Sequence, residues 1–461
     1  MTTAITIGMI IIYVAIMMGI GVYTARQTRS VSDFVLGSHS VGSWLTAFAY
    51  GTSYFSAVVF IGYAGQFGWT YGVSAAWVGI GNALLGSLLA WIVLGRRTRI
   101  MTQSLGAKTM PEYFEKRWNS KGLKIAAALI VFVFLIPYTA SVYNGLSRLF
   151  NMAFQIESEG AYKIIIIVMA LLTAIYVILG GYAATAINDF IQGIVMLIGI
   201  AAVVICAIQN QGGLTSALAA LGEIEVNGKT NTLNSVFGPD PLNLLGVVIL
   251  TSLGTWGLPQ MIHKFYAIKS ENDIKKGAVI STVFALIVAG GSYLLGGFDR
   301  LFCTLTEDGS GKTVISTLSN GKPDFDAMIP SLLHTALPDI LIGLVVVLVL
   351  SASMSTLSSL VLTSSSTLTI DLIKPNLKKC SDKKEMLIMR VLIAVFLVIS
   401  VLLAFNKNAS ISTLMSYSWG ALAGAFLGPF MYGLFSRKIT KPAVWTSFIL
   451  GIGLTLVHMF Q

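Results

Sequence analysis

Hydroxyl side chains are concentrated in one apolar stretch of the 461-residue chain, where they could present oxygen atoms to a small cation. The stretch Leu350–Thr369 contains twelve Ser and Thr residues, and its charged flanks are Asp339 and Asp371. An uncharged segment of this length is typical of a helix that crosses a membrane. The helical repeat places one set of residues on a single face: Ala352, Ser355, Thr356, Ser359 and Thr363. This face either hydrogen-bonds a neighbouring helix, as Ser and Thr commonly do in membranes, or lines a cation site.

A second stretch offers backbone oxygens. Gly51 lies at the centre of SWLTAFAYGTSYFSAVVFIGYAG, and we expect the helix to be interrupted there. An unwound helix exposes carbonyls that would otherwise accept hydrogen bonds from amides four residues on. The carbonyls of Thr52, Phe55 and Ala352, with the hydroxyls of Ser355 and Thr356, would make five neutral oxygens from two helices. Such oxygens suit a sodium ion that must be released in each cycle, whereas the alternative for these residues is ordinary helix packing.

Asp189 is the one acidic residue that the sequence places well inside an apolar span. A carboxylate within the membrane is costly and marks a functional site by default, although Asp189 could instead lie in the cytoplasmic interface. If it faces Ser358 and Ser359, it completes a second cation site, which would share Ser355 with the first.

Aromatic and polar residues on several spans are candidates for a solute cavity. Aromatic residues at helical spacing also serve as packing, so both interpretations stay open for each of them. The candidates are Tyr54, Tyr138, Thr251, Thr255, Trp256, Tyr417 and Trp419.

The composition identifies an all-α polytopic membrane protein. The chain is 55% hydrophobic and 11% charged, with a mean hydropathy of +0.80. The long apolar spans lack the alternation of barrel strands, so helices are implied. Cys206, Cys303 and Cys380 lie too far apart to suggest a disulfide framework or a metal cluster. Because no catalytic motif stands in a suitable context, we expect a protein that is not an enzyme.

Basic residues record membrane topology. We count twelve apolar spans, from Ile5–Thr24 to Ala443–Met459. With the N-terminus outside, 23 of the 30 Lys and Arg residues fall on the cytoplasmic side, including Lys264 at the end of the seventh span. This distribution explains the net charge of +10 without a nucleic-acid partner. We expect a multi-pass protein of the plasma membrane, the inner membrane of a bacterium, with both termini outside.

Breaks in two spans indicate an internal repeat. If the first helix is peripheral, the second and seventh spans each begin a five-helix unit, and an odd number of helices gives the units opposite orientations. The expected breaks lie at Gly51 and at Gly254–Pro259, in corresponding positions, which is the sequence signature of a secondary transporter with a binding site at the bilayer midplane. The expected divisions are a first helix and connector (1–40), a first repeat (41–210), an extracellular loop (211–241), a second repeat (242–436) and a last helix (437–461).

The chain resembles the sodium/solute symporter family, which includes carriers of proline, pantothenate, sugars, sialic acid and monocarboxylates. The resemblance rests on stretches spread in order along nearly the whole chain: FVLGSHSVGSWLTAFAYGTSYFSAVVFIG, GAKTMPEYFEKRW, LGGYAATAINDFIQG, GTWGLPQMIHKFYA, SASMSTLSS and SYSWGALAGAFLGPF. It implies a LeuT-like fold of two inverted five-helix units with peripheral helices, and coupling to Na⁺.

The resemblance also implies roles for individual residues. The shared sodium site of the family corresponds to Thr52, Phe55, Ala352, Ser355 and Thr356. Asp189, Ser358 and Ser359 match a further sodium site of some members, and Tyr138 matches a tyrosine near the substrate of proline carriers.

Departures from the family pattern bear on the solute. Proline carriers have an aspartate where this chain has Tyr54, and their aromatic contacts correspond to Thr251 and Thr255. Ser56-Ala57 is closer to the pantothenate and monocarboxylate branches, so Ser56 joins the substrate-binding candidates. We therefore expect a sodium-coupled symporter, functional as a monomer, that imports a small carboxylate-bearing solute by alternating access. The alternatives are a sugar or sialic acid symporter, a sodium-dependent sensor or channel-like protein, and a membrane-embedded enzyme.

Overall fold

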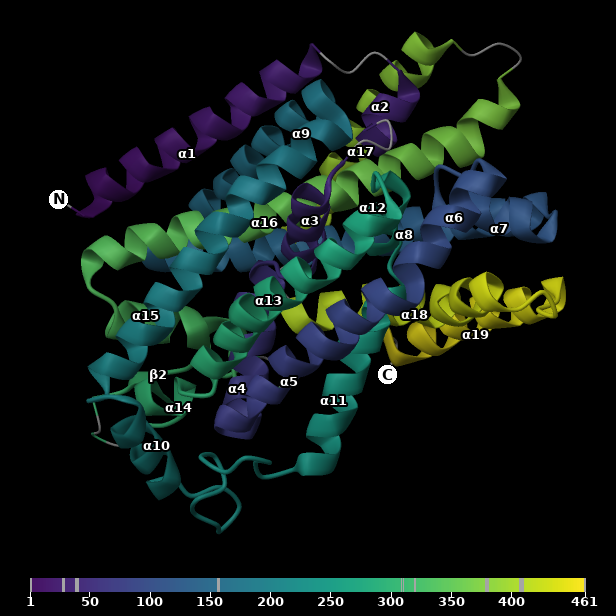
Figure 1. The fold of residues 1–461 in the computed structure, drawn as a ribbon. Coiled ribbons are helices and arrows are strands. Elements are labelled where there is room, and N and C mark those ends of the chain that lie inside the picture. Colours follow the sequence, from purple (N-terminus) through teal and green to yellow (C-terminus); the bar gives the residue numbers. More distant parts are fainter. Residues whose placement is uncertain are drawn as a thin grey trace.

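A computed structural model describes residues 2–26, 30–37, 41–155, 158–307, 309, 311–318, 321–377, 381–405 and 410–459. Cys380, one of the three cysteines, lies outside the described residues. Long helices make up nearly all of the described chain, and the only strand pairing within it is a short parallel pair on one side (Figure 1). An all-α architecture is confirmed.

The α-helices range from 4 to 52 residues in length. The α-helices are α1 (Thr2–Ala25), α2 (Val31–Leu36), α3 (Ser43–Tyr54), α4 (Ala64–Tyr71), α5 (Ala76–Gly81), α6 (Arg96–Leu105), α7 (Met110–Trp118), α8 (Lys121–Phe154), α9 (Glu159–Asn210), α10 (Leu214–Glu223), α11 (Pro241–Leu253), α12 (Pro259–Ala267), α13 (Glu271–Gly296), α14 (Asp299–Phe302), α15 (Met328–Ala336), α16 (Asp339–Thr367), α17 (Asp382–Ala404), α18 (Ile411–Phe435) and α19 (Lys441–Met459). The π- and 3-10-helical segments are η2 (Val58–Tyr63), η3 (Gly72–Ala75), η4 (Asn82–Leu88), η5 (Trp91–Gly95), η6 (Gly254–Gly257), η7 (Phe325–Ala327), η8 (Leu368–Ile373) and η9 (Lys374–Asn376), and the strands are β1 (Cys303–Thr304) and β2 (Thr313–Val314).

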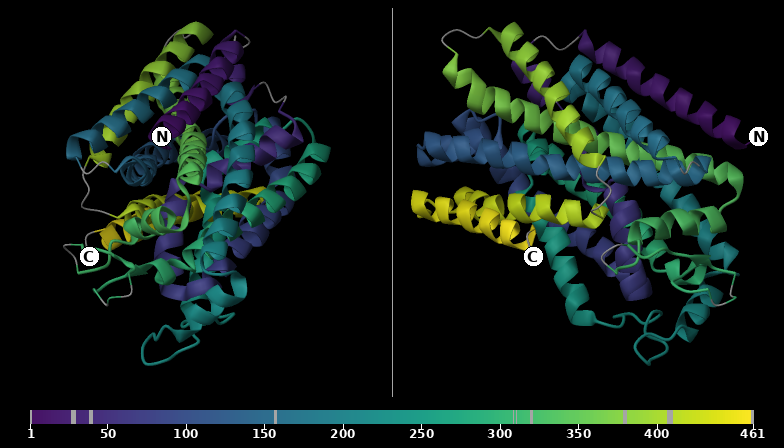
Figure 2. Two further views of the ribbon diagram at one scale, coloured as in Figure 1. Left: turned by 90° about the vertical axis from the view of Figure 1, so that its left-hand side faces the viewer. Right: turned by 180° about the vertical axis from the view of Figure 1, so that it is seen from behind.

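Helix α16, which carries the hydroxyl-rich stretch, lies at the centre of the bundle. It packs against α1, α3, α8, α9 and α17. In its apolar segment 83% of the residues are buried, against 22% for α1 and for α19. The other two views show α1 and α19 at the outside of the bundle (Figure 2). Helices α1 and α19 thus lie at the outside of the bundle, while the expected division of the chain into two repeats with peripheral ends stays a prediction.

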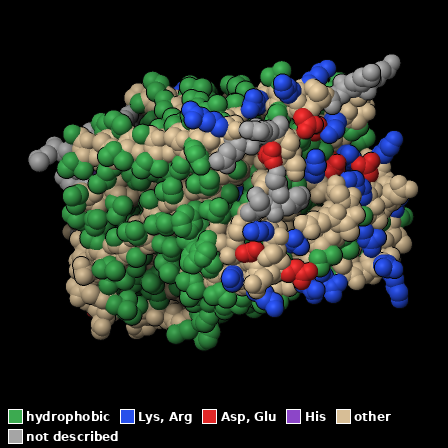
Figure 3. All heavy atoms as spheres, turned by 45° about the horizontal axis from the view of Figure 1, so that its top comes forward, with side chains coloured by type: hydrophobic (Ala, Val, Ile, Leu, Met, Phe, Trp, Pro, Cys, Tyr) green, Lys and Arg blue, Asp and Glu red, His purple; other side chains and the backbone are tan. Residues whose placement is uncertain are grey.

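The outer surface is that of a membrane protein. Figure 3 shows hydrophobic side chains over most of one face, with Lys, Arg, Asp and Glu gathered toward one end. By length and composition, the described chain has eight helices able to cross a membrane, or up to nine if one bent pair counts as a span. A multi-pass protein is confirmed, whereas the number twelve stays a prediction. One reason for the lower count is that α9 runs through two predicted spans, across a kink at Gly181 (φ 55°, ψ −146°).

The first broken helix differs in detail from the prediction. Gly51 is helical within α3, so the expected interruption at Gly51 is wrong. The break follows at Phe55, whose backbone is extended (φ −104°, ψ 95°), and the chain then continues into η2 and α4. Gly51 serves packing instead, because a Cβ atom there would lie 2.4 Å from the ring of Phe284.

The second broken helix lies where the sequence placed it. Helix α11 passes into η6, Leu258 is extended (φ −82°, ψ 120°), and Pro259 begins α12 at an angle of 53°. Pro is well suited to the first turn of a helix because it lacks the N–H that would otherwise go unbonded there.

Candidate functional site

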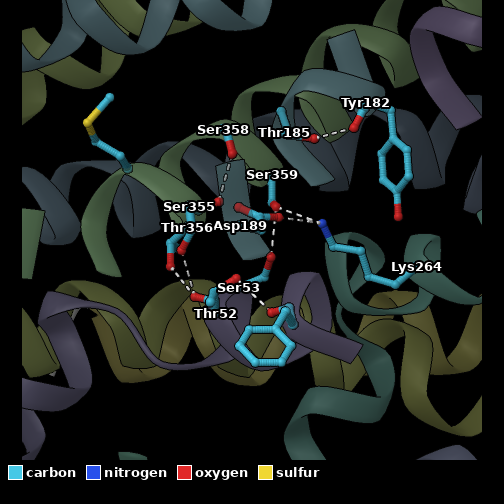
Figure 4. A network of polar contacts seen from close by, with 12 residues as sticks. Thr52, Ser53, Tyr182, Thr185, Asp189, Lys264, Ser355, Thr356, Ser358 and Ser359 are labelled. Atoms are coloured by element: carbon cyan, nitrogen blue, oxygen red, sulfur yellow. Dashed lines mark hydrogen bonds and ion pairs between the residues drawn. The ribbon is translucent and has the colours of Figure 1, made fainter. Parts of the chain in front are cut away.

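The break after α3 leaves a backbone oxygen facing α16. Because Phe55 turns out of the helix, the amide four residues beyond Thr52 no longer continues the helical hydrogen bonding, and the Thr52 carbonyl accepts from other donors. The Ser355 hydroxyl donates to it at 2.9 Å and the Thr356 hydroxyl at 3.3 Å. Both hydroxyl oxygens also lie 3.1 Å from the Ala352 carbonyl oxygen, so each single hydroxyl proton is shared between the two carbonyls. Residues more than 300 positions apart thus bring four uncharged oxygens together (Figure 4).

The remaining member of this set lies beside it. Phe55 and Ser56 line a small cavity with Ala352. The exposed fraction is at most 1% for each of the five residues Thr52, Phe55, Ala352, Ser355 and Thr356. We call these five residues the first cation position: Thr52, Phe55, Ala352, Ser355 and Thr356.

The chemistry of the first cation position fits a sodium ion. Carbonyl and hydroxyl oxygens are hard, uncharged ligands, and a hydroxyl keeps two lone pairs when its proton points elsewhere. Ser355 and Thr356 would bind the ion through their oxygens after rotating their protons away from Thr52. The Thr52 hydroxyl donates to the Phe48 carbonyl at 2.8 Å, so Thr52 offers its backbone oxygen to the site and not its side chain.

A charged cluster lies next to the first cation position. Asp189 on α9 is fully buried, and its Oδ2 atom lies 3.7 Å from Nζ of Lys264 on α12. The Lys264 ammonium donates to the Ser359 hydroxyl at 2.9 Å, and Ser359 shares a 2.8 Å hydrogen bond with Ser53. Four elements, including both broken helices, therefore meet at this cluster (Figure 4). We call Asp189, Lys264, Ser359 and Ser53 the second cation position.

Lys264 is the residue that the sequence interpretation misplaced. It was expected at the cytoplasmic end of its span, but it is only 2% exposed and lies inside the bundle. The break at Leu258 turns α12 so that Lys264 points toward Asp189. A basic residue five positions beyond Pro259, inside the predicted broken span, was the signal for an intramembrane ion pair.

Ser358 lies apart from the ion pair. Its hydroxyl donates to the Ser355 carbonyl at 2.8 Å, along its own helix. Of the residues expected in a second sodium site, Asp189 and Ser359 are joined through Lys264, while Ser355 belongs to the first cation position. The role of this set as a sodium site stays a prediction.

Two of the expected solute residues carry buried donors. The ring of Tyr138 on α8 lies against Trp419 on α18, with centroids 6.3 Å apart. The Tyr138 hydroxyl and the Trp419 Nε1–H are both buried, and within the described chain neither makes a hydrogen bond of good geometry, although the Tyr138 hydroxyl lies near Trp419 and Ser56. Because these two donors lie together on adjacent helices, both are able to donate to one ligand. Tyr54 joins the same group, because its ring lies 6.2 Å from that of Trp419.

The other expected solute residues make contacts within the protein. Tyr54 donates to the Thr251 carbonyl at 2.7 Å, which connects the two broken helices. Other such bonds run from Thr251 Oγ1 to Asn82 Oδ1 (3.0 Å), from Thr255 to the Ser252 carbonyl (2.8 Å) and from Trp256 Nε1 to the Leu85 carbonyl (3.1 Å).

The sequence did not predict the contacts of Tyr417 or of Asn82. The Tyr417 ring lies 6.0 Å from that of His458 on the peripheral α19, so it faces away from the Tyr138–Trp419 pair. Asn82, which the sequence did not single out, accepts from both Thr251 and Ser252, the latter at 3.1 Å. No cluster of three or more His, Cys, Asp or Glu residues suited to a metal occurs among the described residues.

Comparisons with known proteins identify the family to which this sequence is similar. A model of the sodium:solute symporter family matches residues 34–451. The chain belongs to this family. It is 30% identical to a sodium/proline symporter of Staphylococcus aureus strain JH9 over 459 residues, covering 97% of this chain and 85% of that protein, with the same values for strain JH1. Members of the family are transporters, so the protein is not an enzyme, and sodium is the coupling ion.

Solved structures show the same fold. A sodium-coupled sialic acid symporter in an outward-open state superposes with a TM-score of 0.74 at 17% identity, covering 98% of this chain and 96% of that one. A nucleobase-cation-symport-1 family transporter in a closed conformation gives 0.52 at 14% identity, covering 92% of each chain. The LeuT-like fold expected from the family resemblance is confirmed.

Proposed function

We propose that this sodium-coupled symporter imports a small carboxylate-bearing solute by alternating access, with the driving sodium ion bound at the first cation position. The observation that carries the sodium assignment is the Thr52 carbonyl, freed by the break in α3 and met by Ser355 and Thr356 of α16. An ion between these helices would hold them together, which favours one conformation of the carrier over the other.

The solute class rests on the unpartnered donors of Tyr138 and Trp419. A carboxylate offers two acceptor oxygens, which match two adjacent O–H and N–H groups without requiring a basic residue. Proline and sialic acid, the solutes named for two of the three kinds of relative, both carry a carboxylate. Tyr54 and Ser56 flank the break of α3 on the way from this pair to the first cation position. We assign Thr251, Thr255 and Trp256 a supporting role, since their polar atoms already bond within the protein.

The broken helices also support a proposal for the organisation of the carrier. We assign 41–210 and 242–436 to two inverted repeats, separated by the loop 211–241 and flanked by 1–40 and 437–461. Both termini would lie outside the plasma membrane of a bacterium, and the bundle would work as a monomer.

A thermal-shift screen followed by uptake measurements tests the solute class. Purified protein is heated with proline, monocarboxylates, pantothenate, sialic acid or neutral sugars, each in sodium chloride and in N-methylglucamine chloride. A ligand at 100 times its Kd adds about 2.7 kcal/mol to the unfolding free energy, so the bound class raises the melting temperature, and we expect the rise only for carboxylates with sodium. A stabilising solute is then offered to proteoliposomes under an inward sodium gradient. Stabilisation by neutral sugars alone would contradict the proposal.

Tyr138→Phe sharpens the test of the binding donors. Loss of one hydrogen bond to a charged group costs about 1.5–3 kcal/mol, so we expect roughly a 10- to 100-fold weaker solute affinity. Tyr143→Phe is the matched control, since its hydroxyl on the same helix is also buried without a partner in the described chain. Equal effects of the two substitutions would remove Tyr138 from the solute site.

A further inference from the structure

The second cation position already contains a positive charge that belongs to the protein. Nζ of Lys264 lies 2.9 Å from the Ser359 hydroxyl and 3.7 Å from Oδ2 of Asp189, and all three residues are at most 4% exposed. A sodium ion bound to both Asp189 and Ser359 would need the space that this ammonium fills. The residues present at this position therefore do not fit a second sodium ion.

We propose that Lys264 is the tethered cation of the second position, so that the carrier takes up one sodium ion with each solute molecule. The proposal rests on the proposed function, because it assumes that the mobile sodium ion binds at the first cation position.

The negative charge of Asp189 supports a cation that stays at the second cation position permanently. A buried carboxylate requires a compensating cation, and within the described chain Asp189 has no hydrogen-bond partner on either oxygen, so Lys264 is the group that balances it. The Lys264 ammonium also lies 5.3 Å from the centroid of the Tyr182 ring, an arrangement that favours a cation. A sodium ion beside Lys264 would find the space occupied by the ammonium group and would be repelled by its like charge.

Lys264 links the two broken helices. Lys264 stands five residues after Pro259 in the short helix α12, which follows the second break. Ser359 joins it to Ser53, whose neighbour Thr52 supplies the carbonyl of the first cation position. The ammonium thus connects the second broken helix with the one that holds the mobile ion.

Lys264→Met is the substitution that tests the proposal. The methionine side chain follows the path of the lysine side chain and is one atom shorter. It therefore leaves the position of the ammonium group empty and fills the rest of the space that Lys264 occupies. The unpaired Asp189 then takes up a cation or a proton from solution, so sodium binding is measured at alkaline pH, where the carboxyl is ionised. Equilibrium binding of ²²Na⁺ to purified, solute-free protein should give one sodium ion per wild-type chain and two per Lys264→Met chain.

Two further variants separate the charge from the fold. Lys264→Arg keeps a positive charge and should bind one sodium ion. Asp189→Asn/Lys264→Met removes both charges and should also bind one, because no carboxylate remains to attract the second ion.

If Lys264→Met fails to fold, the number of sodium ions bound per wild-type chain still tests the proposal. Two sodium ions per wild-type chain, or one per Lys264→Met chain, would overturn the role of Lys264 and leave sodium symport intact. No sodium bound by the wild type would overturn the proposed function and this inference with it.

Discussion

The two cation positions lie side by side but differ in charge. The first is built from uncharged carbonyl and hydroxyl oxygens, whereas the second contains a carboxylate with an ammonium 3.7 Å away. Both use the last turn of α3, through Thr52 and Ser53, and the same two turns of α16. This difference is the basis of our proposal that a mobile ion binds at one position and that a fixed charge occupies the other.

Physical chemistry explains the division of roles. Neutral oxygens replace the hydration of an ion without a net charge, so the ion can leave again. A buried carboxylate holds its counter-ion far more strongly, since two unit charges about 4 Å apart attract by roughly 4 kcal/mol at an effective dielectric constant of about 20. A permanent partner such as Lys264 suits this position, and a released ion suits the first.

The largest effect is expected from removing both hydroxyls of the first cation position. Ser355→Ala/Thr356→Ala deletes two ligands, so the apparent sodium affinity in uptake assays should fall by at least about 100-fold, more than the loss of a single supporting contact. Ser366→Ala is the matched control on the same helix, because its buried hydroxyl bonds the Thr363 carbonyl away from the site. If the double variant took up solute like the wild type, the first cation position would not be the binding site of the mobile sodium ion.

A large effect on stability is expected from breaking the ion pair at the second position. Asp189→Asn leaves the Lys264 ammonium buried without its partner, which costs about 3–5 kcal/mol. The melting temperature should fall accordingly, while the sodium Hill coefficient stays near that of the wild type. Asp189→Asn/Lys264→Met should recover most of the stability, since an apolar replacement of both charges is often neutral. A falling Hill coefficient in Asp189→Asn would instead indicate a second transported ion.

Substitutions of Thr356 and Thr52 distinguish a residue that binds sodium through its side chain from one that binds it through its backbone carbonyl. Thr356→Val removes a hydroxyl that faces the Thr52 carbonyl, and we expect sodium affinity to fall by about 10-fold. Thr52→Val removes only a hydroxyl bonded to Phe48, so sodium affinity should change by less than about 3-fold while stability falls by about 1 kcal/mol. Sodium titrations of the melting temperature measure both, and a reversed order would mean that Thr52 acts through its side chain.

The smallest effect is expected where the two positions touch. Ser53→Ala breaks the 2.8 Å bond to Ser359 but leaves Ser359 its bond from Lys264. We expect a loss of about 1 kcal/mol in stability and an unchanged sodium affinity. A marked loss of sodium affinity would show that the positions act as one site.

Local sequence patterns were sufficient for the features set by composition and helical spacing. The hydroxyl face of α16 and the break before Pro259 follow from residue type and a period of 3.6 residues. The first break was placed at Gly51 because glycine is the usual signal, yet Gly51 is there to accommodate the ring of Phe284. Phe55 carries no local signal for its extended backbone, which depends on the packing of α3 against its neighbours.

Long-range contacts account for what the sequence could not give. Lys264 looked like an interfacial residue because its span ends near other basic residues, and only the turn at Leu258 brings it to Asp189. Tyr417 and Trp419 were grouped together, although two residues apart on a helix lie about 200° from each other. That spacing alone could have separated Tyr417, which faces His458 of α19, from Trp419.

Direct sodium binding to solute-free protein tests the first cation position without a need for the solute. Wild-type protein and the Ser355→Ala/Thr356→Ala variant are titrated with ²²Na⁺ at constant ionic strength, with melting temperatures confirming that both are folded. We predict saturable binding by the wild type and none by the double variant over the same range. Undiminished sodium binding by the folded double variant would contradict the assignment of the ion to the oxygens between α3 and α16.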